Sequence, residues 1–200
     1  SSSFEPPGTQ AARLAESFDG AGRSSPLRHF SATSAAGLHT SVADLAKLIQ
    51  AHRPGPGGGA IGRGVLSPAA LTEMRRPHGR QYGAEIWGLG VMLYAPNNSG
   101  SYIIGHDGDN EPTINTSARL DPDSGDGIVV LESGTPLLAT RLAGEWVFWR
   151  TGHVDTLTVL MEARQTLTLL VAGWVAILAM GLIAGWRLWR RRLTTPARPA

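Results

Sequence analysis

The pattern of apolar and polar positions predicts two helices near the start of the chain. Apolar residues recur three or four apart at Val42, Leu45, Leu48 and Ile49, which indicates an amphipathic helix with Thr40 or Ser41 as its N-cap. A second helix is expected from Ser67 to about Arg75, because a serine followed by Pro68 is typical of a helix start.

A run of strands follows, and then a third helix. Residues 86–94, 101–106, 113–120 and 127–132 are rich in β-branched and aliphatic side chains and are separated by turns rich in Gly, Pro, Asn and Asp. Short turns make neighbouring strands antiparallel. A helix over residues 136–150 is predicted to face the sheet with Leu138, Leu142, Trp146 and Trp149. The soluble part therefore reads as an α+β fold, an antiparallel sheet flanked by helices.

The stretch from Ser101 to Asn110 has two interpretations. Asp107-Gly108 is a strong signal for a two-residue hairpin turn. Gly105 and Gly108 also bracket His106 at the end of an apolar strand, and a glycine in a strand often marks the close approach of a ligand or another backbone. The local pattern leaves both readings open.

The last segment predicts a transmembrane helix. The 22 residues from 165 to 186 carry no charge, and at 1.5 Å per residue they span about 33 Å, enough to cross a hydrocarbon core. A buried core helix is the alternative. Arg187, Arg190, Arg191 and Arg192 follow the span, which predicts a single-pass protein of the plasma membrane with a cytoplasmic C-terminus and an extracytoplasmic folded part. Gly181 and Gly185 form a G-x-x-x-G pattern that could contact a partner helix in a dimer.

Composition limits the function classes. Cysteine is absent, so thiol chemistry is excluded. Lys47 is the only lysine, so a lysine cannot activate a nucleophile anywhere else in the chain. Residues 1–165 hold 13 basic and 16 acidic groups, a formal charge of −3. Because the basic character belongs to the tail, no nucleic-acid partner is expected. The chain opens at Ser1 without a methionine or a signal-like apolar run, which suggests a fragment or a processed product.

The expected organisation has five parts. Residues 1–34, rich in Ser, Gly and Pro, form a connecting segment, and residues 35–152 form the folded domain. A juxtamembrane segment over 153–164 leads to the lipid-spanning helix at 165–186, and a basic tail covers 187–200.

Five segments, in order, resemble the serine β-lactamase-related hydrolases, which include class C β-lactamases, esterases, D-aminopeptidases and penicillin-binding types. Residues 34–48 resemble the helix G-G-L-x-S-T-x-x-D-L-A-x-F, residues 66–74 the helix L-S-P-x-x-L-x-x-M, and residues 82–90 the strand entry Y-G-L-G-W. Gly105-His106-Asp107-Gly108 resembles the third active-site motif in its H-x-G form, and residues 127–131 the following core strand. The resemblance implies the C-terminal part of a β-lactamase/transpeptidase-like fold and a bacterial hydrolase.

The resemblance also implies site residues. In this family a serine activated by lysine in S-x-x-K, helped by a tyrosine in Y-x-N, attacks a carbonyl. Carried over, His106 is the polar group facing the pocket, Gly108 leaves room for a small-molecule or peptide acyl substrate, and the Asp109 backbone N–H donates to the oxyanion. No cofactor is implied. Consecutive strand residues point to opposite faces, so His106, Asp107 and Asp109 are not expected to bind a metal.

The chain departs from the family in two respects. It contains neither S-x-x-K nor Y-x-N, so it is expected to be inactive alone, and a non-catalytic membrane-tethered binding or sensing module is the alternative function. His106 also replaces a fixed lysine cation, and Asp107, Asp109 and Glu111 lie nearby in the sequence. An esterase or peptidase-like activity is therefore favoured over hydrolysis of anionic β-lactams.

Overall fold

The computed structural model describes residues 2–4, 14–28, 30–110 and 113–194. The chain divides into two units, residues 1–158 and 159–200. The first unit contains the sheet, the helices packed on it and the first turn of the last helix, and it contains every residue of the candidate site.

One six-stranded antiparallel sheet forms the centre of the first unit. Its strands follow chain order, with each strand next to its neighbour in sequence. They are β1 (Gly79–Gln81), β2 (Ala84–Trp87), β3 (Met92–Pro96), β4 (Tyr102–Asn110), β5 (Ile114–Leu120) and β6 (Gly127–Ser133). The β4–β5 pairing is in register over the whole of β5, from Ile104 opposite Leu120 to Asn110 opposite Ile114.

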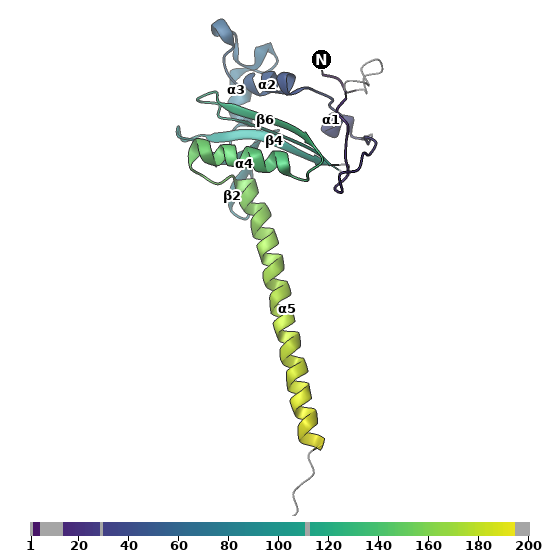
Figure 1. Cartoon of the computed structure of the whole chain (residues 1–200). Helices are drawn as coiled ribbons and strands as arrows, with labels where there is room; N and C mark the ends of the chain where they lie inside the picture. Colours follow the sequence, from purple (N-terminus) through teal and green to yellow (C-terminus); the bar gives the residue numbers. More distant parts are fainter. Residues whose placement is uncertain (1, 5–13, 29, 111–112, 195–200) are drawn as a thin grey trace, which may run out of the picture. The chain divides into compact units, whose positions relative to one another are not determined.

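Helices cover both faces of the sheet. The helices are α1 (Thr33–Ala36), α2 (Val42–Gln50), α3 (Pro68–Met74), α4 (Leu138–Thr151) and α5 (Thr156–Thr194), with two short 3₁₀ turns, η2 (Pro56–Gly58) and η3 (Ile61–Gly64). α2 and α3 lie on one side of the sheet and α4 lies on the other (Figure 1). Ser41 and Ser67 cap α2 and α3 by accepting from the amides of Asp44 and Ala70, which confirms the starts predicted for both helices.

The two faces of the sheet form two small cores. On the α4 side, Met92, Tyr94, Ala95 and Ile103 pack with Val147 of α4. On the α2 side, Val91, Leu93, Ile104 and Leu120 pack together, with Ile49 and Met74 against them. Successive residues of β3 and β4 thus enter opposite cores, as the two-residue period of a strand requires. The exception is Tyr94 and Ala95, where the register between β3 and β4 shifts.

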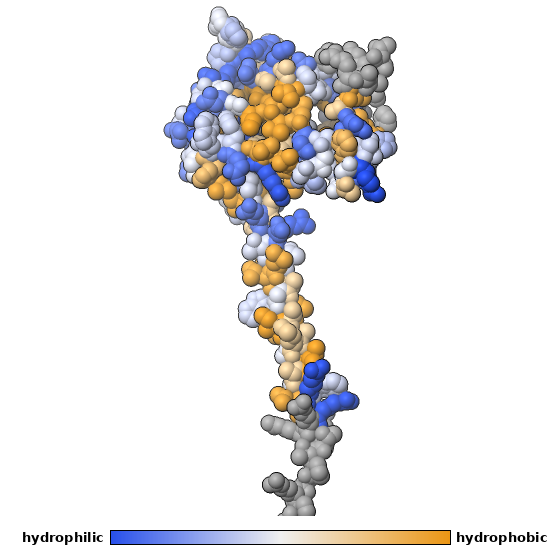
Figure 2. Space-filling view, viewed as in Figure 1, coloured by the Kyte–Doolittle hydropathy of each residue, from blue (hydrophilic) through white to orange (hydrophobic). Residues whose placement is uncertain are grey.

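Helix α5 is long and apolar enough to cross a membrane. The candidate span runs from Thr156 to Arg190, and none of its most apolar window is buried within the chain. Hydrophobic side chains lie along the helix and hydrophilic ones gather toward its C-terminal part (Figure 2). The helix is continuous from residue 156, so it includes part of the region expected to be a separate juxtamembrane segment.

The strand predicted over residues 86–94 is wrong, because the structure divides it. β2 ends at Trp87 and β3 begins at Met92. Between them the chain turns toward α3, where the Leu89 N–H donates to Met74 O at 3.0 Å. A side chain at Gly88 would overlap the same carbonyl, so this turn requires glycine. The sequence pattern also missed the short strand β1.

The face predicted for the third helix is wrong in part, because Trp146 packs against the core but Leu142 and Trp149 do not. The side of α4 that packs on the sheet consists of small residues and one valine, namely Ala139, Thr140, Ala143, Gly144 and Val147. Leu142 is 46% exposed and Trp149 is 78% exposed. Small side chains let the helix approach closely, and Gly144 in particular faces Thr158, whose Oγ1 would lie 2.8 Å from an added Cβ.

A glycine-to-alanine substitution tests the close pairing of β4 and β5. A methyl group at Gly105 would overlap the backbone carbonyl of Ala118, so the strands must separate. We expect Gly105→Ala to lower the free energy of unfolding by about 1–3 kcal/mol, measured by denaturant titration of the chain in detergent. Gly20→Ala is the matched control, since an added methyl there meets nothing within 4 Å. Equal stability of the two variants would contradict the tight pairing.

Candidate active site

Strand β4 carries all three residues that the sequence singles out. The hairpin alternative at Asp107-Gly108 is wrong, because β4 continues through both residues to Asn110. Asp107 pairs with Ser117 and Gly108 with Thr116 across the β4–β5 ladder. His106, Gly108 and Asp109 therefore lie within a regular strand.

His106 and Gly108 line a hollow on the α2 side of the sheet. The hollow has a volume of about 570 Å³, and its walls include Leu45, Leu48, Met74, His106, Gly108 and Thr116. The His106 side chain is exposed, its Nδ1 donates to Asp107 O at 2.7 Å, and its ring centroid lies 6.1 Å from that of Trp87. An added Cβ at Gly108 would lie 2.6 Å from Thr116 Oγ1, so a side chain at this position would collide with Thr116 and glycine avoids the collision.

The backbone of Asp109 faces the edge of β4 opposite β5. The Asn97 N–H donates to Ser101 O across the β3–β4 turn at 2.9 Å. Backbone groups of successive strand residues point to opposite edges, so those of Asp107 and Asp109, which have the same parity as Ser101, point toward the β3 edge. β3 pairs with β4 only as far as Gly105, whereas β5 pairs with it to Asn110.

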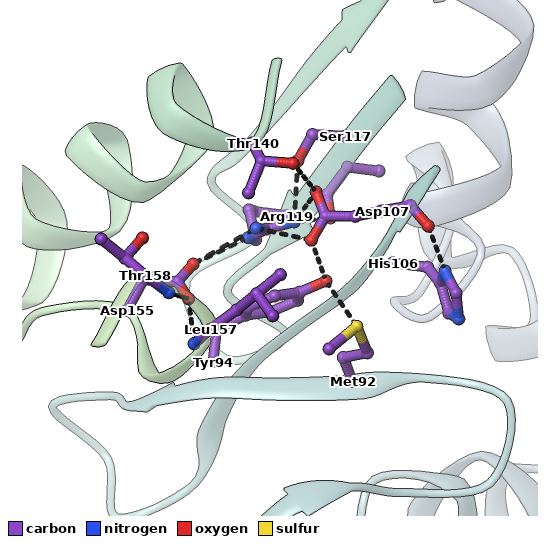
Figure 3. Close-up of polar contacts among 11 residues, drawn as sticks. Met92, Tyr94, His106, Asp107, Ser117, Arg119, Thr140, Asp155, Leu157 and Thr158 are labelled. Carbon is purple, nitrogen blue, oxygen red and sulfur yellow. Dashed lines mark hydrogen bonds and ion pairs between the residues drawn. The ribbon is translucent and has the colours of Figure 1, made fainter. Parts of the chain in front are cut away.

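Asp107 points to the other face and is part of a buried polar cluster that the sequence analysis missed. Its carboxylate accepts from Arg119 Nη1 at 3.0 Å and Nη2 at 2.9 Å, from the Tyr94 hydroxyl at 2.8 Å and from Thr140 Oγ1 at 3.2 Å. Figure 3 shows the Asp107 side chain directed at Arg119 and Tyr94, with His106 on the other side of the strand. The fork geometry is typical of strong arginine–carboxylate pairs.

Arg119 is the centre of this cluster. It is fully buried, and its guanidinium carbon lies 3.3 Å from the centroid of the Tyr94 ring. It also donates to Ser117 Oγ at 2.7 Å and, through Nε and Nη2, to Asp155 Oδ2 at 3.3 and 3.2 Å. One cation thus faces two carboxylates from strand β4 and from the residue before α5.

Burial governs the ionisation of the groups around Arg119. It raises the pKa of the Asp155 carboxyl above its ordinary value, although Arg119 and the amides of Leu157 and Thr158 act in the opposite direction. Burial likewise raises the pKa of the Tyr94 hydroxyl, so Tyr94 remains a neutral donor to Asp107. On the hollow side, burial lowers the pKa of His52, with Arg75 adding to the effect, and His52 is neutral at pH 7.

The position of Asp107 corrects part of the electrostatic argument made from sequence. Asp107 was counted among the acids that crowd His106, but its charge is paired with Arg119 on the opposite face. Glu111 lies outside the described residues, and Asp109 is the other acid of the three that the structure describes. Neither a lysine nor an arginine lines the hollow within the described part of the chain, where His52 and His106 are the titratable bases.

The described residues contain no group of three or more His, Cys, Asp or Glu side chains that could hold a metal ion.

The sequence signal that could have revealed the Arg119 cluster is a charge inside an apolar strand. Ala118-Arg119-Leu120 places a cation between buried positions, and a buried cation requires an acidic partner. The sequence alone does not identify Asp107 as this partner, because Asp107-Gly108 is also typical of a hairpin turn.

The fold and the site together define an α+β domain with an antiparallel sheet, flanking helices and a histidine–glycine motif on a strand beside a hollow. A family model described as Beta-lactamase matches residues 1–146. The chain therefore belongs to the β-lactamase family and has the serine hydrolase-like fold of that family. Neither the comparison with curated proteins nor the comparison with solved structures gave a match.

Substitution of Arg119 tests the buried cluster. Arg119→Met leaves two buried carboxylates without their cation, and we expect a loss of about 3–5 kcal/mol of unfolding free energy at pH 7.5. Burial raises the pKa of the Asp155 carboxyl and Arg119 lowers it, so this pKa rises further without the guanidinium, and the folded variant holds a proton that the unfolded chain has released. The deficit relative to wild type should therefore shrink as the pH falls from 7.5 to 5, measured by denaturant titration. A deficit that grows on acidification would contradict this assignment.

Proposed function

We propose that the chain forms the third-motif part of a serine hydrolase that cleaves ester or amide bonds through an acyl-serine. The observation that carries the proposal is the geometry of β4. Its residues beyond Gly105 pair with β5 and not with β3, and His106 and Gly108 face a hollow on the α2 side. The membership of the β-lactamase family supports the same chemistry.

Each of the three residues has a distinct role in this proposal. His106 presents a polar ring to the acyl substrate, and Gly108 leaves space for the substrate backbone beside Thr116. The backbone N–H of Asp109 donates a hydrogen bond to the oxygen that becomes negative during attack. A donor of this kind typically contributes about 3–4 kcal/mol to lowering the barrier.

The nucleophile has to come from outside these 200 residues. No serine is followed three residues later by lysine, since Lys47 has Asp44 at that position, and no tyrosine is followed two residues later by asparagine. Packing supports the same conclusion. Helix α2 has an apolar face but no buried residue, and Leu48 is 60% exposed beside the hollow. A segment that carries the nucleophile and covers this face would supply the missing motif and bury Leu48.

The walls of the hollow favour a neutral acyl substrate. The described side chains there include no fixed cation that could pair with a substrate carboxylate, and His52 is neutral. We therefore propose a small-molecule or peptide ester or amide rather than an anionic β-lactam. The second candidate function is a membrane-tethered binding or sensing module without catalysis, which the missing nucleophile motif favours.

We further propose a single-pass location in the plasma membrane. Residues 165–186 would cross the bilayer, with the arginines after residue 186 in the cytoplasm and the folded unit outside. An added Cβ at Gly181 or Gly185 meets nothing within 4 Å, so a partner helix could approach closely there and form a dimer.

A proline substitution tests the oxyanion role of Asp109. The chain alone should give no turnover of a p-nitrophenyl ester or a chromogenic β-lactam. When a segment with S-x-x-K and Y-x-N is supplied, from the coding region before residue 1 or as a companion chain, esterase activity should appear. Asp109→Pro, which removes the N–H, should then lower kcat about 100- to 1,000-fold. Asp109→Ala, which keeps the N–H, is the control. Equal kcat values for the two variants, or turnover by the chain alone, would contradict the proposal.

Labelling of single cysteines tests the membrane orientation. The chain has no natural cysteine, so Ser99→Cys in the exposed β3–β4 turn and Ala197→Cys in the tail each give one reactive thiol. In intact cells a membrane-impermeant maleimide should label Ser99→Cys and not Ala197→Cys, and both should react after detergent is added. The reverse pattern in intact cells would mean that the folded unit is cytoplasmic.

A further inference from the structure

Helix α5 begins inside the folded unit. Gly152, in the left-handed conformation with φ 75°, ends α4, and only residues 153–155 separate it from Thr156. The first turn of α5 belongs to the folded unit, which extends to Thr158. Leu157 packs against the core on the α4 side, and Thr156 Oγ1 donates to Tyr94 O at 2.7 Å.

Asp155 is the N-cap of α5. Its Oδ1 accepts from the amides of Leu157 at 2.7 Å and Thr158 at 3.3 Å, the positions that an N-cap side chain normally satisfies. An N-cap is usually solvated, but Asp155 is 1% exposed. The cap therefore lies within the protein interior, where its charge requires a partner.

Arg119 is the partner of the second carboxylate oxygen of Asp155. Oδ2 accepts from Arg119 Nε and Nη2, while the same guanidinium makes the two-pronged pair with Asp107. Asp107 is the middle residue of the His106-Asp107-Gly108 motif. The side chains of Asp155, Arg119 and Asp107 thus connect the first amides of α5 to the strand that lines the hollow (Figure 3).

We propose that Asp155 is a positioning residue that couples the first turn of α5 to strand β4 at His106–Asp109 through Arg119 and Asp107. Arg119 is buried against both carboxylates and cannot turn to water if either one moves. Fraying of the first turn of α5 thus changes the position of Asp107, and movement of β4 weakens the cap. A coupling of this kind acts equally in both directions. It does not depend on whether the chain hydrolyses a substrate.

Hydrogen exchange in the full chain, reconstituted in lipid nanodiscs, tests this coupling from both ends. Asp107→Asn leaves the Asp155 cap intact, yet it should speed exchange of the Leu157 and Thr158 amides by about tenfold, which corresponds to about 1.4 kcal/mol. Asp155→Asn retains a good capping side chain but loses the charge that faces Arg119. It should shift the backbone amide resonances of residues 106–109 and the ring resonances of His106.

Asp121→Asn is the matched control, because it removes another buried carboxylate without touching Arg119. Asp121 is 5% exposed and pairs with Arg150 at 3.6 Å and Asn97 at 2.9 Å. This control should change exchange at Leu157 and Thr158 by less than about twofold if coupling is local to the Arg119 cluster. The proposal is overturned if Asp107→Asn affects these two amides no more than Asp121→Asn does. Should Asp155→Asn fail to fold, the Asp107→Asn measurement alone decides.

Discussion

The ion pairs of Arg119 are the interaction on which the rest of the folded unit depends. A guanidinium with no solvent exposure loses its hydration and recovers that free energy only if every donor finds an acceptor. Asp107, Asp155 and Ser117 provide those acceptors, and the Tyr94 ring lies against its face. The partners come from β3, β4, β5 and the cap of α5, while Thr140 of α4 donates to Asp107. Removing any one partner would take a hydrogen bond or a ring contact from a fully buried guanidinium, so these elements hold a single arrangement together.

The same constraint determines what the hollow can offer a ligand. Because Asp107 is held on the α4 side, the two-residue period of β4 directs His106 and Gly108 to the α2 side. The carboxylate next to the histidine in sequence thus contributes little negative charge to the hollow. Adjacent residues of β4 therefore have different roles. Asp107 fixes the strand from one face, and its neighbours present a polar ring and an open space on the other.

The sequence predicted the elements whose signals are local. Ser41 and Ser67 marked the helix starts, and the uncharged run after Arg164 marked the long helix. The sequence patterns did not predict the features that depend on contacts between residues far apart in the chain. The Asp107-Gly108 pair favours a turn in isolation, but Asp107 is bound by Arg119, twelve residues further along the chain. The face of α4 was misjudged for a related reason. Large apolar residues normally indicate a buried face, whereas a helix that closely approaches a sheet requires small residues such as Ala143 and Gly144.

The proposed function and the packing of helix α2 can be considered together. In the function that we propose, His106, Gly108 and the Asp109 amide bind the acyl group and its oxyanion. The S-x-x-K motif that would supply the nucleophile is absent from the sequence, and Lys47 is paired with Asp44 on the surface of α2. On the apolar side of α2, Ile49 packs against the core, whereas Leu48 beside the hollow is 60% exposed, although an amphipathic helix of this kind normally packs against a partner. A nucleophile-bearing segment lying over α2 would bury Leu48 and bring its serine toward His106 and the Asp109 amide. In the proposed function, one such segment would supply the nucleophile and cover the exposed side chain of Leu48.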